Sequence, residues 1–285
     1  LLRRRQRQMC IRDRMITPAI LIVLYATFLA NVYKDSFVSA TKDMIDLSDK
    51  IINGTVAAQL AAALLAVSCV TVTFCVNLTM VQDRASGARK DFDVSPVSKT
   101  KIYIGYFLST VLNSLMVNGT ALALCLLYIL KMGWYMNASD VIFIILDMIL
   151  LVLFGSTLSS IVSYPLKTQG QLSAVGTIVS AGYGFVCGAY MPISNFSSGL
   201  QKALSYLPGT YGTSLVKNHM LNGVYKEMAD IGMPSEAVTV IRNTLDCNPV
   251  FRGHVVGVSQ MYLIMAGSIV VFGAAYLLII MIRER

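Results

Sequence analysis

The chain has 285 residues, of which 55% are hydrophobic and 13% charged, with a mean hydropathy of +0.65 and a formal net charge of +8. Soluble domains carry about 45–50% apolar and about 25% charged residues, so this composition predicts a protein with several membrane spans. It excludes a disordered chain, a coiled coil and a disulfide-stapled secreted domain.

The N-terminal residues 1–14 contain six of the twelve arginines. This stretch resembles translated adapter read-through at the end of an assembled sequence, and native sequence would then resume at Met15. A basic helix on the cytoplasmic membrane surface is the alternative. Residues 1–14 therefore carry no functional prediction, and residues 15–285 are expected to form one domain. Without the leader, 17 basic and 14 acidic residues leave a net charge of +3, which does not support a nucleic-acid partner.

Six stretches are apolar and long enough to cross the membrane, because about 20 residues of helix span about 30 Å of hydrocarbon. They are residues 16–33, 55–81, 102–130, 141–163, 171–191 and 258–282. The predicted fold class is therefore an all-α integral membrane protein with six transmembrane helices. No small-residue cleavage pattern follows the first stretch, so a cleaved signal peptide is not expected.

The Lys and Arg residues of short loops predict the orientation of the spans. Residues 82–101, residues 164–170 and the C-terminal tail together hold eight, against four in residues 34–54 and 131–140. Both termini are therefore predicted to be cytoplasmic, with a loop at 82–101 on the same side.

Residues 192–257, between the fifth and sixth predicted spans, are then external and are expected to form a short helical cap. Apolar residues at helical spacing predict an amphipathic helix over 196–207, ended by Gly209 and Gly212. A second apolar group over 215–224 predicts another short helix, and Ser235 is expected to cap a third.

Motifs for catalysis are absent from the sequence, which contains no GxxxxGK[ST], HExxH or Gly-x-Ser-x-Gly. The two histidines, His219 and His254, both lie in the predicted external segment and are expected to face solvent rather than bind a metal. Four of the six cysteines lie in predicted spans and one in the leader, which leaves Cys247 without an evident partner. We expect a protein that is not an enzyme and that binds no metal or cofactor itself.

Asp147 is the one ionisable residue deep inside a predicted span. A charge at that depth costs about 2.5–3.5 kcal/mol on insertion scales, so the side chain should face protein or water. It could serve as a proton or cation site. A carboxyl group hydrogen-bonded to polar side chains of neighbouring spans, such as Asn113 or Asn118, is favoured because no intramembrane Lys, Arg or His accompanies it.

Small residues recur every four positions along the fifth predicted span. They are Gly176, Ser180, Gly184 and Gly188. Small residues on one face let helix backbones approach closely. The pattern predicts either packing against another span of the same chain or a subunit interface, and both remain open.

The loop over residues 82–101 combines mixed charges with a rigid Ser-Pro stop, which suits either a solvated loop or a docking element. Gly87 is followed eight residues later by Ser-Pro-Val-Ser at 95–98 and then by an aliphatic start to the next span. In this pattern the loop resembles the coupling loop of permease subunits of type-2 ABC exporters, of the multidrug or daunorubicin-resistance kind. Asp83 stands where Glu is usual in that family, and Ala88 where Thr is usual.

A second match follows the fifth span. Residues 188–193 (Gly-Ala-Tyr-Met-Pro-Ile), the pair Leu200-Gln201 and residues 207–211 (Leu-Pro-Gly-Thr-Tyr) are similar to the span exit and first external helix of the same family. With the six-span layout, the resemblance covers nearly all of residues 15–285.

The resemblance implies a membrane permease that pairs with a second permease copy, identical or not, and with two separate ATPase subunits that bind ATP and Mg. It assigns the contact with the ATPase to Asp83, Arg84, Gly87, Arg89, Lys90, Ser95, Pro96, Val97 and Ser98. The first, second and fifth spans would line the dimer interface in the cell membrane of a bacterium.

The cargo is expected to be a hydrophobic or amphiphilic small molecule, such as a drug or lipid-like compound, since no intramembrane Lys or Arg is predicted. Two alternatives stay open: a proton-coupled secondary transporter that uses Asp147, and a membrane scaffold or immunity component that transports nothing.

Overall fold

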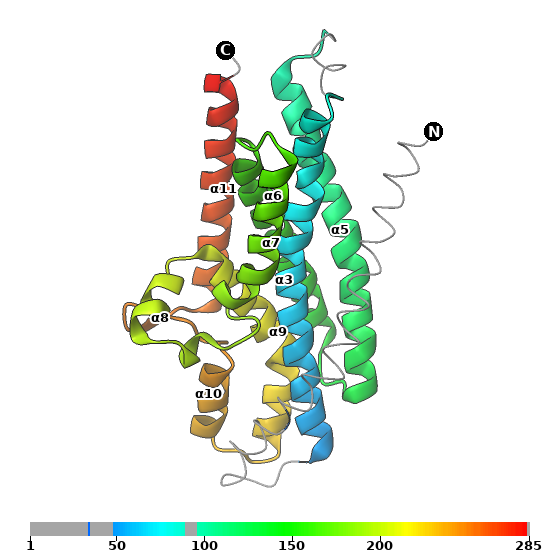
Figure 1. The fold of residues 1–285 in the computed structure, drawn as a ribbon. Helices are drawn as coiled ribbons and strands as arrows, with labels where there is room; N and C mark the ends of the chain where they lie inside the picture. The colour runs from blue at the N-terminus through cyan, green and yellow to red at the C-terminus, as the bar shows by residue number, and fades with distance from the viewer. Residues whose placement is uncertain (1–33, 35–47, 89–95, 284–285) are drawn as a thin grey trace.

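The computed structural model describes residues 34, 48–88 and 96–283. Long helices run side by side along one axis, and shorter elements gather towards one end of this bundle (Figure 1). The leader and the first predicted span, residues 16–33, lie outside the described residues.

Four helices of the described part are long and apolar enough to cross a membrane. They are α3 (Asp49–Ala85), α5 (Lys99–Met132), α6 (Ala138–Ser163) and α11 (Val258–Arg283). These helices confirm the second, third, fourth and sixth predicted spans and an all-α membrane protein.

Helix α3 is the central helix of the bundle. It contacts α5, α6, α7 and α9, and 83% of its most apolar window is buried, against 17% for α11. Alanines allow this crowding because they let neighbouring backbones approach closely. The most enclosed of them are Ala57, Ala58, Ala62, Ala63 and Ala66. Helix α11, by contrast, turns most of its side chains outward, as a lipid-facing helix does.

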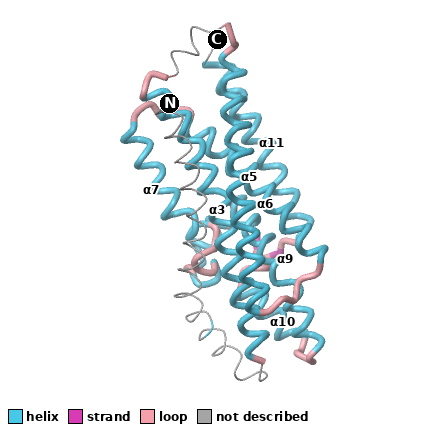
Figure 2. Tube along the Cα trace, turned by 90° about the vertical axis from the view of Figure 1, so that its right-hand side faces the viewer, coloured by secondary structure: helices cyan, strands magenta, loops and turns pink. Residues whose placement is uncertain are grey.

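Helix α7 (Gln169–Val186) is shorter than the fifth predicted span, which was expected to continue through Met191. A tight turn ends it: the N–H groups of Ala189 and Tyr190 both donate to the Gly184 carbonyl, and Gly188 has a φ of +71°. Eighteen residues measure about 27 Å, slightly less than the hydrocarbon core. Figure 2 shows α7 and α11 on opposite sides of the bundle.

Helix α9 (Pro208–Asp230) corrects the prediction for the segment between the last two spans. Gly209 and Gly212 lie inside this helix and do not end one. Helix α9 packs against α3, α6 and α11, and a Cβ at Gly212 would meet Leu151 and Met265. Because Met265 lies seven residues inside α11, α9 begins level with the interior of that span. It is therefore part of the bundle and not of a peripheral cap.

The remaining elements lie on either side of α9 along the chain. They are η2 (Ile193–Asn195), α8 (Ser198–Leu204), α10 (Ser235–Thr244), β1 (Val250–Phe251) and β2 (His254–Val255). The strands pair antiparallel through a turn in which Arg252 and Gly253 both have positive φ, as a two-residue hairpin turn requires. Helices α8 and α10 confirm the first and third predicted short helices, although Ser235 is the first residue of α10 rather than its cap.

Gly223 lies where α9 passes close to another backbone segment, and a Cβ there would overlap the Tyr135 carbonyl. We expect Gly223→Ala to lower the free energy of unfolding by about 1–3 kcal/mol, because the two backbones must separate. Thermal melting in detergent measures this loss. Gly119→Ala on α5 is the matched control, since an added Cβ there meets nothing within 4 Å. Equal melting temperatures for the two variants would contradict this packing.

Candidate functional site

Arg84, at the last turn of α3, connects the ends of three helices. Its guanidinium donates to the carbonyls of Tyr164 (2.5 Å) and Leu166 (3.3 Å), just beyond α6, and to the Tyr103 hydroxyl on α5 (2.8 Å). The guanidinium carbon also lies 5.5 Å and 5.3 Å from the ring centroids of Tyr103 and Tyr164. Such charge-assisted hydrogen bonds and ring contacts hold Arg84 within the chain.

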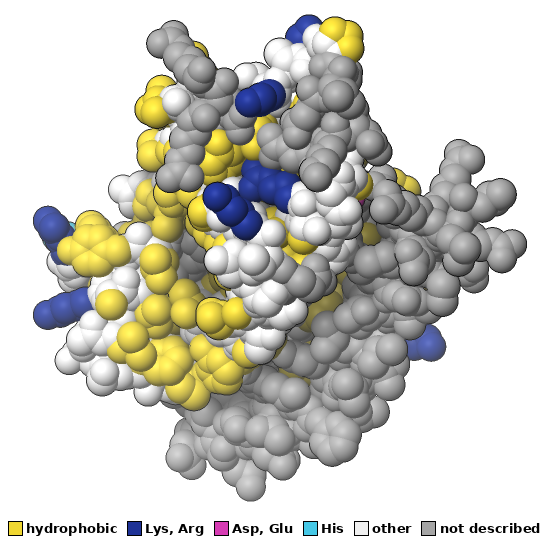
Figure 3. Space-filling view, turned by 45° about the horizontal axis from the view of Figure 1, so that its top comes forward, with side chains coloured by type: hydrophobic (Ala, Val, Ile, Leu, Met, Phe, Trp, Pro, Cys, Tyr) yellow, Lys and Arg dark blue, Asp and Glu magenta, His cyan; other side chains and the backbone are white. Residues whose placement is uncertain are grey.

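The neighbouring residue Asp83 is 8% exposed and accepts a hydrogen bond from the Tyr106 hydroxyl at 2.8 Å. Two of the four charged residues expected to contact an ATPase, Asp83 and Arg84, therefore have partners within the chain. Figure 3, in which this end of the bundle comes forward, shows basic side chains among hydrophobic ones on its described surface.

The rest of the predicted coupling loop divides into two parts. Gly87 has a φ of +74° and open space around its Cα. Pro96, Val97 and Ser98 are exposed immediately before α5, with Val97 at 47%. The other three predicted contact residues, Arg89, Lys90 and Ser95, lie outside the described residues.

We expect Arg84→Gln to lower the free energy of unfolding by about 1–3 kcal/mol, because the carbonyls of Tyr164 and Leu166 lose their donor. Arg84→Lys should recover little of this loss, since one ammonium cannot reproduce the forked geometry. Thermal melting in detergent tests both variants against Lys101→Gln, which removes an exposed charge at the same end. Full recovery by Lys would show that charge alone matters.

Asp147 forms a second site, at the junction of α6, α9 and α11. The carboxylate is 1% exposed. One oxygen lies 2.6 Å from Nδ1 of His219, and the other accepts the Tyr262 hydroxyl at 2.6 Å. The Phe143 ring stacks on the imidazole, with centroids 5.0 Å apart. We call Asp147, His219 and Tyr262 the carboxylate cluster.

The carboxylate cluster corrects two predictions. The asparagines proposed as partners bond elsewhere: Asn118 accepts from Ser68 at 2.7 Å, and Asn113 donates to Ser109. His219 does not face solvent, since its side chain is 12% exposed against Asp147. His254, in contrast, is exposed as expected.

The Asp147 carboxylate has a polar partner on each oxygen, which offsets the cost of burying it in a site of low dielectric constant. Across the described ranges, no three His, Cys, Asp or Glu side chains come together as a metal site. The arrangement joins α6, α9 and α11 through one buried carboxylate.

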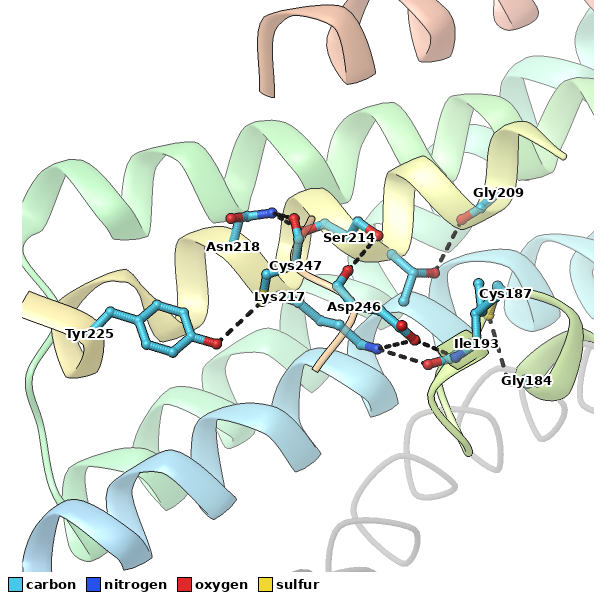
Figure 4. Close-up of polar contacts among 12 residues, drawn as sticks. Gly184, Cys187, Ile193, Gly209, Ser214, Lys217, Asn218, Tyr225, Asp246 and Cys247 are labelled. Carbon is cyan, nitrogen blue, oxygen red and sulfur yellow. Dashed lines mark hydrogen bonds and ion pairs between the residues drawn. The ribbon is translucent and has the colours of Figure 1, made fainter. Parts of the chain in front are cut away.

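A buried lysine on α9 forms the centre of a third group (Figure 4). Lys217 is 1% exposed and donates to the Gly188 carbonyl at 2.8 Å, with the Asp246 carboxylate at 3.8 Å. That carboxylate also accepts the Ile193 N–H at 2.6 Å. Burial raises the pKa of Asp246, and the Lys217 charge opposes that rise. We call Lys217 and Asp246 the lysine pair.

Hydrogen bonds attach the loop after α10 to α9 beside the lysine pair. The Ser214 hydroxyl donates to the Asp246 carbonyl at 2.8 Å, and the Asn218 amide donates to the Cys247 carbonyl. Cys247 is fully buried, its thiol lies 3.4 Å from the Tyr225 hydroxyl, and burial raises the pKa of the thiol. The prediction for Cys247 considered only other cysteines as partners, so the contact with the Tyr225 hydroxyl was not anticipated.

The small-residue pattern of the fifth predicted span is used mainly within the chain. Gly184 leaves room for the Tyr190 ring, Gly176 faces Leu78 of α3, and Gly188 forms the turn beyond α7. Ser180 is exposed on an open groove of about 700 Å³ between α3 and α7. The residues that line it are uncharged and mostly small: Cys75, Leu78, Gln82, Leu172, Ser173, Gly176, Thr177, Ser180 and Ala181.

Four of the described helices are apolar and long enough to span a membrane, and three of them pack against α9, so the structure is that of a multi-pass α-helical membrane protein. The model of the ABC-2 family transporter proteins matches residues 38–282. The chain therefore belongs to the ABC-2 transporter family, which confirms the predicted permease class. No curated protein and no solved structure matches the chain.

Proposed function

We propose that the chain is the permease subunit of an ATP-driven exporter, and that a separate ATPase subunit moves it through the connection between α3 and α5. The observation that carries this proposal is the position of Arg84. It ties the end of α3 to α5 and to the carbonyls that follow α6. A force on this connection would therefore reach three helices together.

The central position of α3 supports the same mechanism. Because α3 contacts α5, α6, α7 and α9, a rigid-body movement of α3 must move or repack each of these neighbours. ATP and Mg belong to the ATPase in this proposal, since the chain has no phosphate-binding loop. The exposed residues 96–98 would enter the ATPase surface, and Pro96 would fix the turn.

The groove between α3 and α7, with its small side chains, suits close approach of a helix from a second copy. Lys217 is a buried cation of the described bundle, and Gly188 and Asp246 engage its ammonium. Because these partners occupy the ammonium group, Lys217 is not available to bind an anionic cargo. We therefore propose that the cargo is a hydrophobic or amphiphilic small molecule, exported across a cell membrane.

The test is co-purification of the chain with its ATPase from native membranes, followed by ATP hydrolysis in vesicles. Val97→Asp should reduce retained ATPase activity at least about tenfold, because it replaces an apolar contact with an unpaired charge that loses water when the two subunits meet. Val240→Asp on α10, of similar exposure at 52%, should leave it unchanged. Transport driven by a proton gradient without ATP, and abolished by Asp147→Asn, would instead establish a secondary transporter.

A further inference from the structure

Helix α8 with the residues after it, and the β1–β2 hairpin, meet through Tyr206 and Phe251 although they are about 50 residues apart in the sequence, and both segments expose hydrophobic side chains. Five of these side chains are between 41% and 60% exposed: Leu200, Tyr206, Leu207, Val250 and Val255. We call these residues, with Phe251, the α8–hairpin patch.

Aromatic contacts hold the two halves of the patch together. Tyr206 and Phe251 meet edge to face, with centroids 5.2 Å apart. Arg252 lies over Phe251, with its guanidinium carbon 5.5 Å from the ring centroid, and reaches the Tyr206 hydroxyl at 3.5 Å. The patch is therefore a built surface and not a chance exposure of single side chains.

The patch adjoins the start of the apolar helix α11. Helix α11 begins at Val258, three residues after β2, and exposes Leu263, Val270 and Val271 at 62–73%. Figure 1 shows α8 standing out from the bundle beside the start of α11. A hydrophobic surface that continues an apolar span at its end is placed at the level of the lipid headgroups.

The exposed charges beside the patch are positive. Lys202 on α8 and Arg252 in the hairpin turn are both exposed. No Asp or Glu occurs in residues 192–226 or in residues 247–283. The acidic residue nearest to the hairpin in sequence, Asp246, is 8% exposed and faces Lys217.

We propose that the α8–hairpin patch lies in the headgroup region of the membrane and binds anionic phospholipid headgroups through Lys202 and Arg252. The apolar side chains enter the upper acyl region, while the ammonium and the guanidinium meet the phosphate groups above it. Tyr206 and Phe251 take the place of the aromatic residues that mark membrane borders. This inference needs only the membrane location of the chain and does not depend on an ATPase.

The depth of the patch can be measured because the chain has a single tryptophan, Trp134. In a Trp134→Phe background, a tryptophan is introduced by Tyr206→Trp, by Leu263→Trp on α11 or by Val240→Trp on α10. The proteins are placed in nanodiscs of phosphatidylcholine that carries bromine near the headgroup or deep in the chains. Tyr206→Trp should be quenched most by the shallow bromine and Leu263→Trp by the deep one. Val240→Trp should be quenched by neither. If neither bromine position quenches the fluorescence of Tyr206→Trp more than that of Val240→Trp, the patch does not lie in the membrane and the proposal is wrong.

The charge preference is measured by phosphatidylglycerol retained against phosphatidylcholine after purification from mixed vesicles. Each of Lys202→Gln and Arg252→Gln should lower this ratio about fivefold, the factor equivalent to ~1 kcal/mol for one basic residue near an anionic surface. Lys226→Gln, which removes an exposed charge from the far end of α9, should not lower it. An unchanged ratio in the double variant, at an unchanged melting temperature, would overturn headgroup binding. If inorganic phosphate displaces the retained phosphatidylglycerol at constant ionic strength, Lys202 and Arg252 bind a soluble anion instead. That result would also overturn headgroup binding.

Discussion

Asp147→Ala is expected to lower the free energy of unfolding by about 3–5 kcal/mol, because it leaves His219 and Tyr262 buried without their shared partner. The carboxylate is 1% exposed and receives contacts at 2.6 Å from two other helices. Removing the carboxylate therefore removes the contacts that it forms from α6 to His219 on α9 and to Tyr262 on α11. Thermal melting and SDS titration of the detergent-solubilised protein measure the loss.

Two controls separate this effect from a general sensitivity of the bundle. Asp147→Asn keeps an amide oxygen that can accept the Tyr262 hydroxyl, so it should lose less. Asn113→Ala removes a polar group that bonds only within its own helix turn, and it should be nearly neutral. If the carboxylate cluster acts as a unit, His219→Ala should cost little in an Asp147→Ala background. Additive losses would show that the two side chains act separately.

The same variants bear on the choice between mechanisms. A coupling carboxylate must exchange its proton during transport, whereas a structural carboxylate must only keep its partners. Under the proposed ATP-driven mechanism, Asp147→Asn lowers transport only as far as it lowers the amount of folded protein.

Lys217→Met is expected to lower the free energy of unfolding by about 3–5 kcal/mol, because it leaves the buried Asp246 carboxylate without a cation. Burial already raises the pKa of Asp246, and loss of the opposing Lys217 charge raises it further. A carboxyl group with a raised pKa takes up a proton on folding, so its contribution to stability falls as the pH rises. The loss in the variant should therefore be larger in mildly alkaline than in mildly acidic buffer, as followed by melting temperature across pH.

The matched control removes both charges. Lys217→Met with Asp246→Asn should recover much of the stability, because the amide oxygen can still accept the Ile193 N–H. It should also remove the added pH dependence. Lys226→Met, at an exposed position of the same helix, should change neither quantity. A double variant as unstable as the single one would show that packing around the lysine chain, and not its charge, is what matters.

The sequence by itself determined that this chain is a helical membrane protein, and it determined four of the spans. Apolar sequences as long as those of α6 and α11 are unfavourable in water, and as helices their length matches the thickness of the hydrocarbon core. It also led to the right family, because the order of the loop around Pro96 and the span exit at Gly188 resembles that of ABC-2 permeases. The end of α7 could not be predicted in the same way. The turn at Gly188 is made of apolar residues, so a hydropathy profile continues the predicted span through it.

Only the tertiary structure decided the place of α9. Lys217, Asn218 and His219 lower the hydropathy of this segment, so the sequence placed it outside the bundle. In the fold, Lys217 meets Asp246, 29 residues away, and His219 meets Asp147, 72 residues away. A polar side chain is costly to bury only when it lacks a partner, and a partner so distant in sequence becomes apparent only when the helices pack.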